Sequence, residues 1–211
     1  MLYKLLFPQL AQRVWKPINL NDFAEITHQF QPEVNFLDAV QMNDWLHQVH
    51  EDLGCDYSYG GYLEDRSHLW CGSYIKKDSA IHLGIDFNVP MGTEVYSAHS
   101  GKVVDILYDP ENFGWGGRVT IQINSNLYVV YAHLNLLTTL LFNKGDELIK
   151  GDFIGHTGSP NQNGDWYEHL HIQLLTKFSV DFDGYSKYYD GIENDYPNPE
   201  LILKGIANDP M

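Results

Sequence analysis

Apolar residues between positions 36 and 53 recur mostly at intervals of three and four, which is the spacing of one face of an amphipathic helix. They are Phe36, Ala39, Val40, Trp45, Leu46, Val49 and Leu53. Asn35 is the expected N-cap of this helix, and Gly54 is expected to end it. His47 and His50 fall among the acidic residues of its polar side, so we expect both imidazoles to be solvated.

From about position 80 to 175 the pattern changes to short apolar runs separated by turn residues, which is typical of β-strands. The turn sequence Asn124-Ser125-Asn126 between two of these runs predicts a β-hairpin. Many short strands joined by tight turns predict a mainly β fold, in the form of a compact, folded-over antiparallel β-sheet domain. The predicted strands cover 81–89, 94–97, 102–108, 118–123 and 127–134.

These patterns divide the chain into three parts. Residues 1–74 form an N-terminal extension whose one amphipathic helix covers about 36–53, since prolines break the first 34 positions into short pieces without clear periodicity. Residues 75–176 form the central β domain, and residues 177–211 form an acidic, aromatic tail that packs on it. Within that tail 197–203 can form a short helix, and we expect its role to be structural.

The chain has a formal net charge of −15, which argues against binding to nucleic-acid phosphates and to anionic membrane surfaces. No apolar run reaches the roughly 18 residues of a transmembrane helix. The N-terminus lacks the long apolar region and cleavage site of a signal peptide, which predicts a cytoplasmic protein, or a periplasmic or extracellular one if another route exports it. Cys55 and Cys71 are expected to be reduced thiols, with a disulfide between them as the alternative.

Candidate metal ligands lie in two strand-like segments. His169 and His171 are two residues apart, and His82 and Asp86 are four apart, so each pair shares one face of an extended strand. Gly84 leaves room above the face between His82 and Asp86. Two histidines and an aspartate form a ligand set for a catalytic Zn²⁺, because three protein ligands leave the fourth tetrahedral position for water.

Three motifs together resemble the signatures of the lysostaphin/LytM-type zinc metallopeptidases, whose fold is the duplicated hybrid motif. They are His-x-Gly-x-Asp at 82–86, Tyr-Ala-His-Leu at 131–134 and His-Leu-His at 169–171, in the same order as in the family. The resemblance covers roughly residues 75–176. It implies one zinc ion per chain, held by His82, Asp86 and His171, with His133 and His169 as the paired catalytic histidines. It also implies hydrolysis of peptide bonds in peptidoglycan cross-bridges or stem peptides.

Two features depart from the family pattern. The approach to the His-x-His strand is bulky and acidic, so Trp166, Tyr167 and Glu168 either shape a different substrate groove or belong to a longer surface loop. The apparent lack of a signal peptide favours one alternative, a zinc hydrolase of soluble peptides or amides. A non-catalytic zinc-binding module on the same fold is a separate alternative. Glu64 and Arg66 are expected to form a surface ion pair, with substrate contact as the alternative. The sequence does not indicate an oligomeric state.

Overall fold

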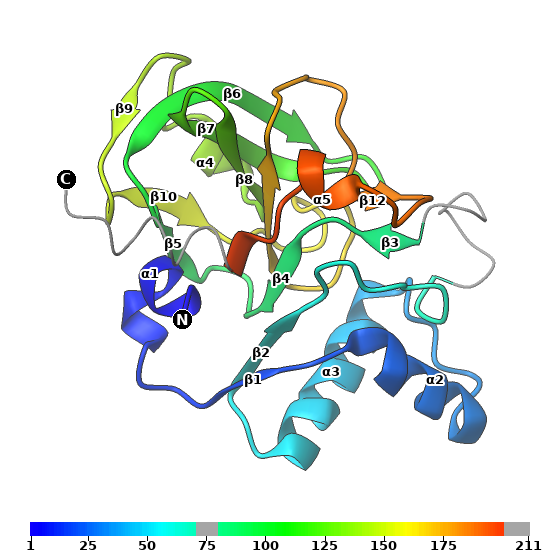
Figure 1. Ribbon diagram of the computed structural model, residues 1–211. Coiled ribbons are helices and arrows are strands. Elements are labelled where there is room, and N and C mark those ends of the chain that lie inside the picture. The colour runs from blue at the N-terminus through cyan, green and yellow to red at the C-terminus, as the bar shows by residue number, and fades with distance from the viewer. Residues whose placement is uncertain (71–79, 201–211) are drawn as a thin grey trace.

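The computed structural model describes residues 1–70 and 80–200. Its main element is a curved sheet of eight strands (Figure 1), in the order β1-β2-β4-β11-β8-β7-β6-β9. Chain segments far apart in sequence therefore lie side by side, and the N-terminal extension supplies the first two strands of the same sheet. The strands are β1 (Trp15–Pro17), β2 (Tyr57–Gly60), β4 (Ile85–Asn88), β11 (Leu170–Leu175), β8 (Leu127–Leu134), β7 (Gly116–Asn124), β6 (Gly101–Asp109) and β9 (Glu147–Leu148).

Neighbouring strands of this sheet are antiparallel, except for the parallel edge pair β1 and β2. Strands β7 and β8 form the predicted hairpin, closed by the pairing of Asn124 with Leu127. Two further pairs join β5 (Glu94–Tyr96) to β10 (Phe153–His156) and β3 (Ile81–His82) to β12 (Tyr185–Ser186). The predicted mainly β, antiparallel fold is confirmed, although the strand expected over 81–89 is divided between β3 and β4.

Helix α3 (Ala39–Leu53) is the predicted amphipathic helix, but it begins later than expected. Its N-cap is Asp38, whose carboxylate accepts hydrogen bonds from the amides of the first turn, so the prediction of Asn35 as the cap is wrong. Gly54 ends the helix in the left-handed conformation, with φ of 64°, as expected. The solvated state predicted for His50 is also wrong, because this side chain is buried and hydrogen-bonded to Ser58 on β2.

The first 34 residues contain more regular structure than predicted. Asn19 is the N-cap of helix α2 (Leu20–Phe30), and the Asn19 side chain accepts a hydrogen bond from the amide of Asp22. Its apolar residues pack with those of α3 and with Trp166 of the loop before β11. The short elements α1 (Tyr3–Leu6), η1 (Pro8–Leu10), α4 (Leu136–Thr139) and α5 (Ile192–Asp195) complete the helices of the described residues.

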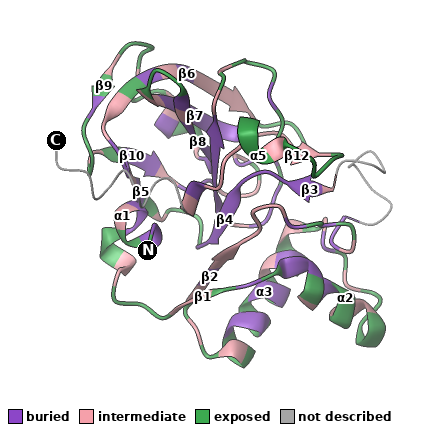
Figure 2. Ribbon diagram, in the orientation of Figure 1, coloured by how far each residue is buried: buried purple, intermediate pink, exposed green. Residues whose placement is uncertain are grey.

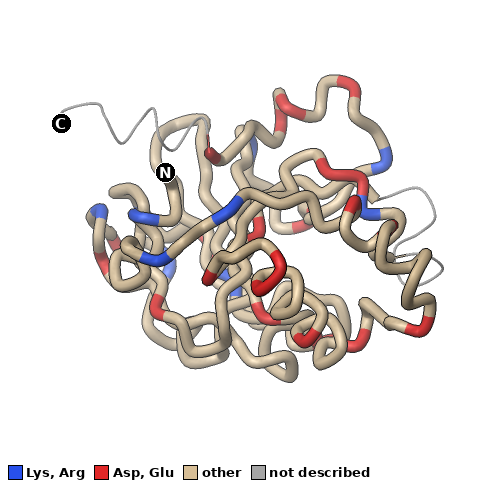
Figure 3. The backbone as a smooth tube through the Cα atoms, turned by 90° about the horizontal axis from the view of Figure 1, so that it is seen from below, with Lys and Arg blue, Asp and Glu red and all other residues tan. Residues whose placement is uncertain are grey.

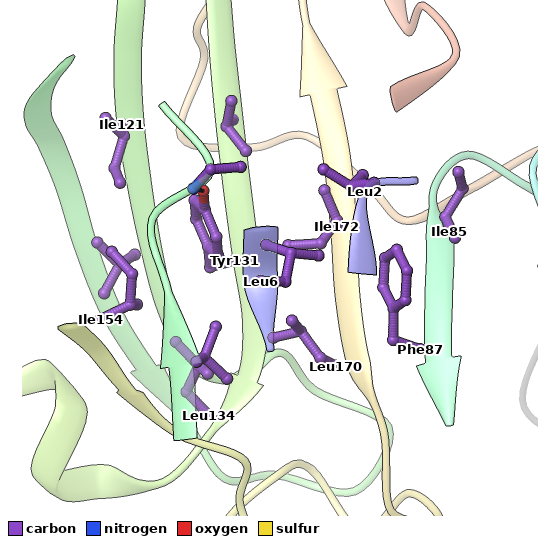
Figure 4. Close-up of a cluster of buried hydrophobic side chains, with 14 of the residues drawn as sticks. Leu2, Leu6, Ile85, Phe87, Ile121, Tyr131, Leu134, Ile154, Leu170 and Ile172 are labelled. Carbon is purple, nitrogen blue, oxygen red and sulfur yellow. Dashed lines mark hydrogen bonds between the residues drawn. The ribbon is translucent and has the colours of Figure 1, made fainter. Parts of the chain in front are cut away.

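The main core lies on one face of the sheet (Figure 4), where Leu2, the N-cap of α1, and Leu6, its last residue, meet Phe87 of β4 and Ile172 of β11. In Figure 2 the central strands are purple, which marks buried residues, and the outer faces of the helices are green, which marks exposed ones. Full burial of one leucine contributes about 1.5–3 kcal/mol to stability. The N-terminus therefore packs into the same core as the strands that carry the motifs.

Charged residues are spread over the part of the chain that the structure describes (Figure 3). In the full sequence 28 acidic residues outnumber the 13 lysines and arginines. Across residues 1–70 and 80–200, no helix is long and apolar enough to cross a membrane.

Cys55 is a free, half-buried thiol, whereas Cys71 lies outside the described residues. The helix expected over 197–203 likewise extends beyond them.

Candidate metal centre

His82, Asp86 and His171 meet at one point although they come from three strands. Asp86 on β4 and His171 on β11 occupy paired positions of adjacent antiparallel strands, and His82 ends the neighbouring β3. All three side chains are buried. His171 Nδ1 lies 2.9 Å from Asp86 Oδ1, and His82 Nε2 lies 3.0 Å from His171 Nδ1 and 3.4 Å from Asp86 Oδ1.

These distances fit one metal ion. Tetrahedral zinc with bonds of about 2.0–2.1 Å holds its ligands about 3.3 Å apart. The other ring nitrogens are already engaged: His82 Nδ1 lies 2.9 Å from the carbonyl oxygen of Gly61, and His171 Nε2 lies 3.0 Å from Gln173 Oε1. His82 Nε2, His171 Nδ1 and Asp86 Oδ1 are thus the three atoms that can bind a metal.

Gly84, between the two ligands of the first motif, must remain without a side chain. A Cβ at this position would lie 2.5 Å from Cε1 of His171 and 2.7 Å from the backbone oxygen of Ile172. The expected room above this face is therefore filled by the imidazole of His171, the third candidate ligand.

The ionisation of these side chains suits a metal. Burial lowers the pKa of His82 to about 3, so its imidazole is neutral at pH 7, as metal ligation requires. Burial opposes ionisation of Asp86, but His82 and Arg66 outweigh it and hold the pKa of Asp86 well below its usual range. The site therefore offers the neutral imidazole of His82 and the carboxylate of Asp86.

His133 and His169 form a second pair beside the three ligands, with ring centroids 4.4 Å apart. Each Nδ1 lies 2.8 Å from a backbone oxygen, that of Asn163 for His133 and that of Tyr167 for His169. These contacts fix Nδ1 as the protonated nitrogen and leave both Nε2 atoms as bases. Burial lowers the pKa of His169 to about 4 and the pKa of His133 well below its usual range, so both are neutral at pH 7.

A cavity of about 60 Å³ opens onto all five of these side chains. Its walls are largely aromatic and come from three separate segments: Phe113, Trp115, Trp166, Tyr167 and Tyr185. Trp166 and Tyr167 are buried in the cavity wall rather than exposed on a surface loop. Glu168 lies elsewhere, and its carboxylate accepts a hydrogen bond from the amide of Met91.

Arg66 also lines the cavity, and this contradicts its expected place in a surface ion pair. Its side chain is 1% exposed, and Nη1 donates to Asp86 Oδ2 at 2.6 Å. Tyr185, in the tail expected to be only structural, lies against His82 with ring centroids 5.3 Å apart. Both contacts join residues distant in sequence, so local patterns could not reveal them. The contact between Gln173 and His171 could have been predicted from the sequence, because strand alternation places both side chains on the same face.

Comparisons with known proteins agree with this geometry. Residues 80–182 match the sequence model of peptidase family M23. The chain is 31% identical over 104 residues to the peptidoglycan DD-endopeptidase ShyA of Vibrio cholerae, a match that covers 49% of this chain and 22% of ShyA. It is also 31% identical over 104 residues to lysostaphin of Staphylococcus staphylolyticus, covering 48% of this chain and 20% of lysostaphin.

The chain thus spans only about a fifth of the length of these curated relatives. Among solved structures, the catalytic domain of lysostaphin from Staphylococcus simulans matches at 24% identity with a TM-score of 0.49, covering 77% of this chain and 97% of that domain. The predicted family is confirmed for this part of the chain: residues 80–182 form a domain of peptidase family M23, of the lysostaphin and LytM type.

Proposed function

We propose that the protein is a zinc-dependent metallopeptidase that hydrolyses peptide bonds of peptidoglycan. The observation that carries this proposal is the meeting of three buried ligand atoms with a neutral histidine pair at one cavity. A closed structural zinc site has four protein ligands, whereas this cluster has three and faces a cavity. The substrate class is supported by matched relatives of Vibrio cholerae that are named peptidoglycan DD-endopeptidases.

His82, Asp86 and His171 would hold the zinc ion. When bound, zinc polarises the scissile carbonyl and lowers the pKa of a water molecule. Nε2 of His133 or His169 would accept a proton from the attacking water, and the resulting imidazolium would donate that proton to the leaving amine. A positioned acid or base of this kind contributes typically about 10²–10⁴-fold to a rate.

The aromatic walls have a different task. Phe113, Trp115 and Trp166 enclose the cavity with apolar surface and limit the access of bulk water. Removal of water strengthens the hydrogen bonds and charges inside the site. Trp166 is held there because its ring packs at 5.1 Å on both Phe113 and Trp70, which places the loop before β11 over the cavity.

The test is hydrolysis of purified peptidoglycan compared with a panel of soluble peptides and amides. We expect release of new amino groups from peptidoglycan, loss of this activity after chelation, and recovery on addition of Zn²⁺. Cleavage of the soluble panel alone would contradict the substrate class. Stoichiometric zinc binding without hydrolysis of either would identify a non-catalytic zinc-binding module instead.

A further inference from the structure

Residues 61–66 contact two of the three candidate metal ligands, although they lie outside the segment that matches the family, 80–182. Residues 61–66 run along β3 and are hydrogen-bonded to it. The amide of Leu63 donates to the oxygen of His82 at 2.8 Å, the amide of His82 donates to the oxygen of Glu64 at 2.9 Å, and the amide of Arg66 donates to the oxygen of Ala80 at 2.9 Å. The backbone of the N-terminal extension is thus fixed beside the first metal-binding motif.

The two carboxylate oxygens of Asp86 have different surroundings. Oδ1 faces the other ligands, 2.9 Å from His171 Nδ1 and 3.4 Å from His82 Nε2. Oδ2 accepts hydrogen bonds from Arg66 Nη1 at 2.6 Å and from the hydroxyl of Tyr167 at 3.2 Å. The two donors occupy the outer oxygen and leave the inner oxygen directed at the metal position.

Arg66 is itself held in place by a second carboxylate. Its Nη2 lies 3.5 Å from Glu64 Oε2, and its Nη1 lies 3.4 Å from the hydroxyl of Tyr185. Glu64 is anchored in turn, because its Oε1 accepts a hydrogen bond from the amide of Asn21 at 2.7 Å. A planar guanidinium can bridge two carboxylates in a fixed geometry, whereas the ammonium of lysine is a compact point charge on a flexible stem.

Gly61 supplies the second contact to a ligand. Its backbone oxygen accepts the Nδ1 proton of His82, which leaves Nε2 free for the metal. The approach requires glycine, because φ at this position is 101° and a Cβ would lie 2.8 Å from His82 Nδ1 and also collide with the Arg66 guanidinium.

We propose that Arg66, assisted by Tyr167, is a positioning residue of the metal centre, and that the N-terminal extension is therefore a built-in part of the site. By occupying the outer oxygen of Asp86, the two donors hold the carboxylate with one oxygen toward the metal. This inference rests on the proposed function only in that it takes His82, Asp86 and His171 as the metal ligands.

The test measures the apparent Kd for Zn²⁺ in the full chain by competition with a chromophoric chelator. Arg66→Lys keeps the positive charge but removes the planar guanidinium that bridges two carboxylates. A change in the affinity for Zn²⁺ therefore reports on positioning rather than on charge. Loss of a partner that orients a metal ligand typically weakens metal binding by about 10–100-fold, and we expect Arg66→Lys to fall in this range. Tyr167→Phe removes only the second donor and should lie near the lower end.

Arg118→Lys is the matched control. Arg118 is the other fully buried arginine of the described residues, and it pairs with Asp105 at 3.0 Å instead of with a metal ligand. Its replacement should lower stability while leaving the Kd for Zn²⁺ unchanged. Circular dichroism and a thermal melt of each metal-free variant establish that it is folded. If Arg66→Lys does not fold, Tyr167→Phe decides the matter, because it removes no buried charge.

Folded Arg66→Lys and Tyr167→Phe proteins that bind Zn²⁺ as tightly as the wild type would overturn the inference, even if the wild type hydrolyses peptidoglycan. Weakened binding in both variants would support it, even if no peptidoglycan is cleaved. Hydrolysis measured in parallel therefore separates failure of this inference from failure of the proposed function. If hydrolysis occurs, we expect kcat at limiting zinc to fall while KM stays constant.

Discussion

His171 and Asp86 are paired across neighbouring antiparallel strands, and Nδ1 of the histidine lies 2.9 Å from Oδ1 of the aspartate. Because strand pairing fixes this contact, the relative position of two candidate metal ligands is set by the backbone of the sheet rather than by a loop. A site on regular elements is held more precisely than one on loops. The central strands of the core thus serve both stability and the proposed chemistry.

Replacement of Gly84 by alanine should disturb the site without removing any ligand. The new methyl group would lie 2.5 Å from Cε1 of His171, so the imidazole or the neighbouring backbone must shift. We expect a loss of about 1–3 kcal/mol in the free energy of unfolding, as is typical of overpacking, and weaker zinc binding. Urea unfolding and chelator competition measure the two effects.

Gly92→Ala is the control for Gly84→Ala. Gly92 has a φ of 78° and no other heavy atom within 4 Å of its hypothetical Cβ. This variant should lose stability through backbone strain alone and bind zinc normally. Equal zinc affinity in both variants would contradict the steric role given to Gly84.

The stability of the metal-free protein should fall as the pH is lowered from about 6.5 toward 4. Burial lowers the pKa of His82 to about 3 and that of His99 and His169 to about 4, from the ordinary value of 6.5. In this window the unfolded chain binds protons that the folded chain does not, so protonation favours unfolding. The stability is fully present above about pH 6.5 and is lost by roughly 1–3 kcal/mol per histidine.

Urea unfolding at several pH values checks this dependence. His99→Gln, which removes a buried histidine outside the metal cluster, should make the curve less steep without abolishing it. An unfolding free energy that stays constant between pH 7 and 5 would contradict the neutral, buried state of these imidazoles.

Asn19→Ala should destabilise the N-terminal helices. The Asn19 side chain caps α2, and loss of such a cap costs about 1 kcal/mol. The matched control is Gln29→Ala, an exposed substitution within the same helix that should change the unfolding free energy by less than about 0.5 kcal/mol. Equal effects of the two changes would argue against the observed start of α2.

Helix α2 also illustrates why part of the fold could not be predicted. Its inward face carries Leu20 and Ala24, but Ile26 and Phe30 are 55% and 79% exposed, which obscures the apolar periodicity. The strand pattern of 127–134 had no such conflict, because the turn at 124–126 marks its start and nearly all of its residues are buried. Local patterns thus predicted an element where its apolar residues are buried and its polar residues exposed. They failed where apolar residues such as Ile26 and Phe30 are exposed.

The candidate site divides in the same way. His82, Asp86, His133, His169 and His171 belong to short motifs whose spacing is visible along the chain, and the structure brings all five to one cavity. Arg66, by contrast, reaches Asp86 across 20 residues, and Tyr185 reaches Arg66 across 119. Their burial follows from tertiary packing, which no local periodicity reports.

The division of roles within His169-Leu170-His171 is the central claim, and two single substitutions test it by metal content. His171→Ala removes a metal ligand, so zinc bound per chain should fall well below one. His169→Ala should retain zinc near one per chain while peptidoglycan hydrolysis falls by about 10²–10⁴-fold. Zinc is measured by atomic emission after dialysis, on variants shown to be folded. Retention of zinc by His171→Ala, or undiminished hydrolysis by His169→Ala, would contradict the account.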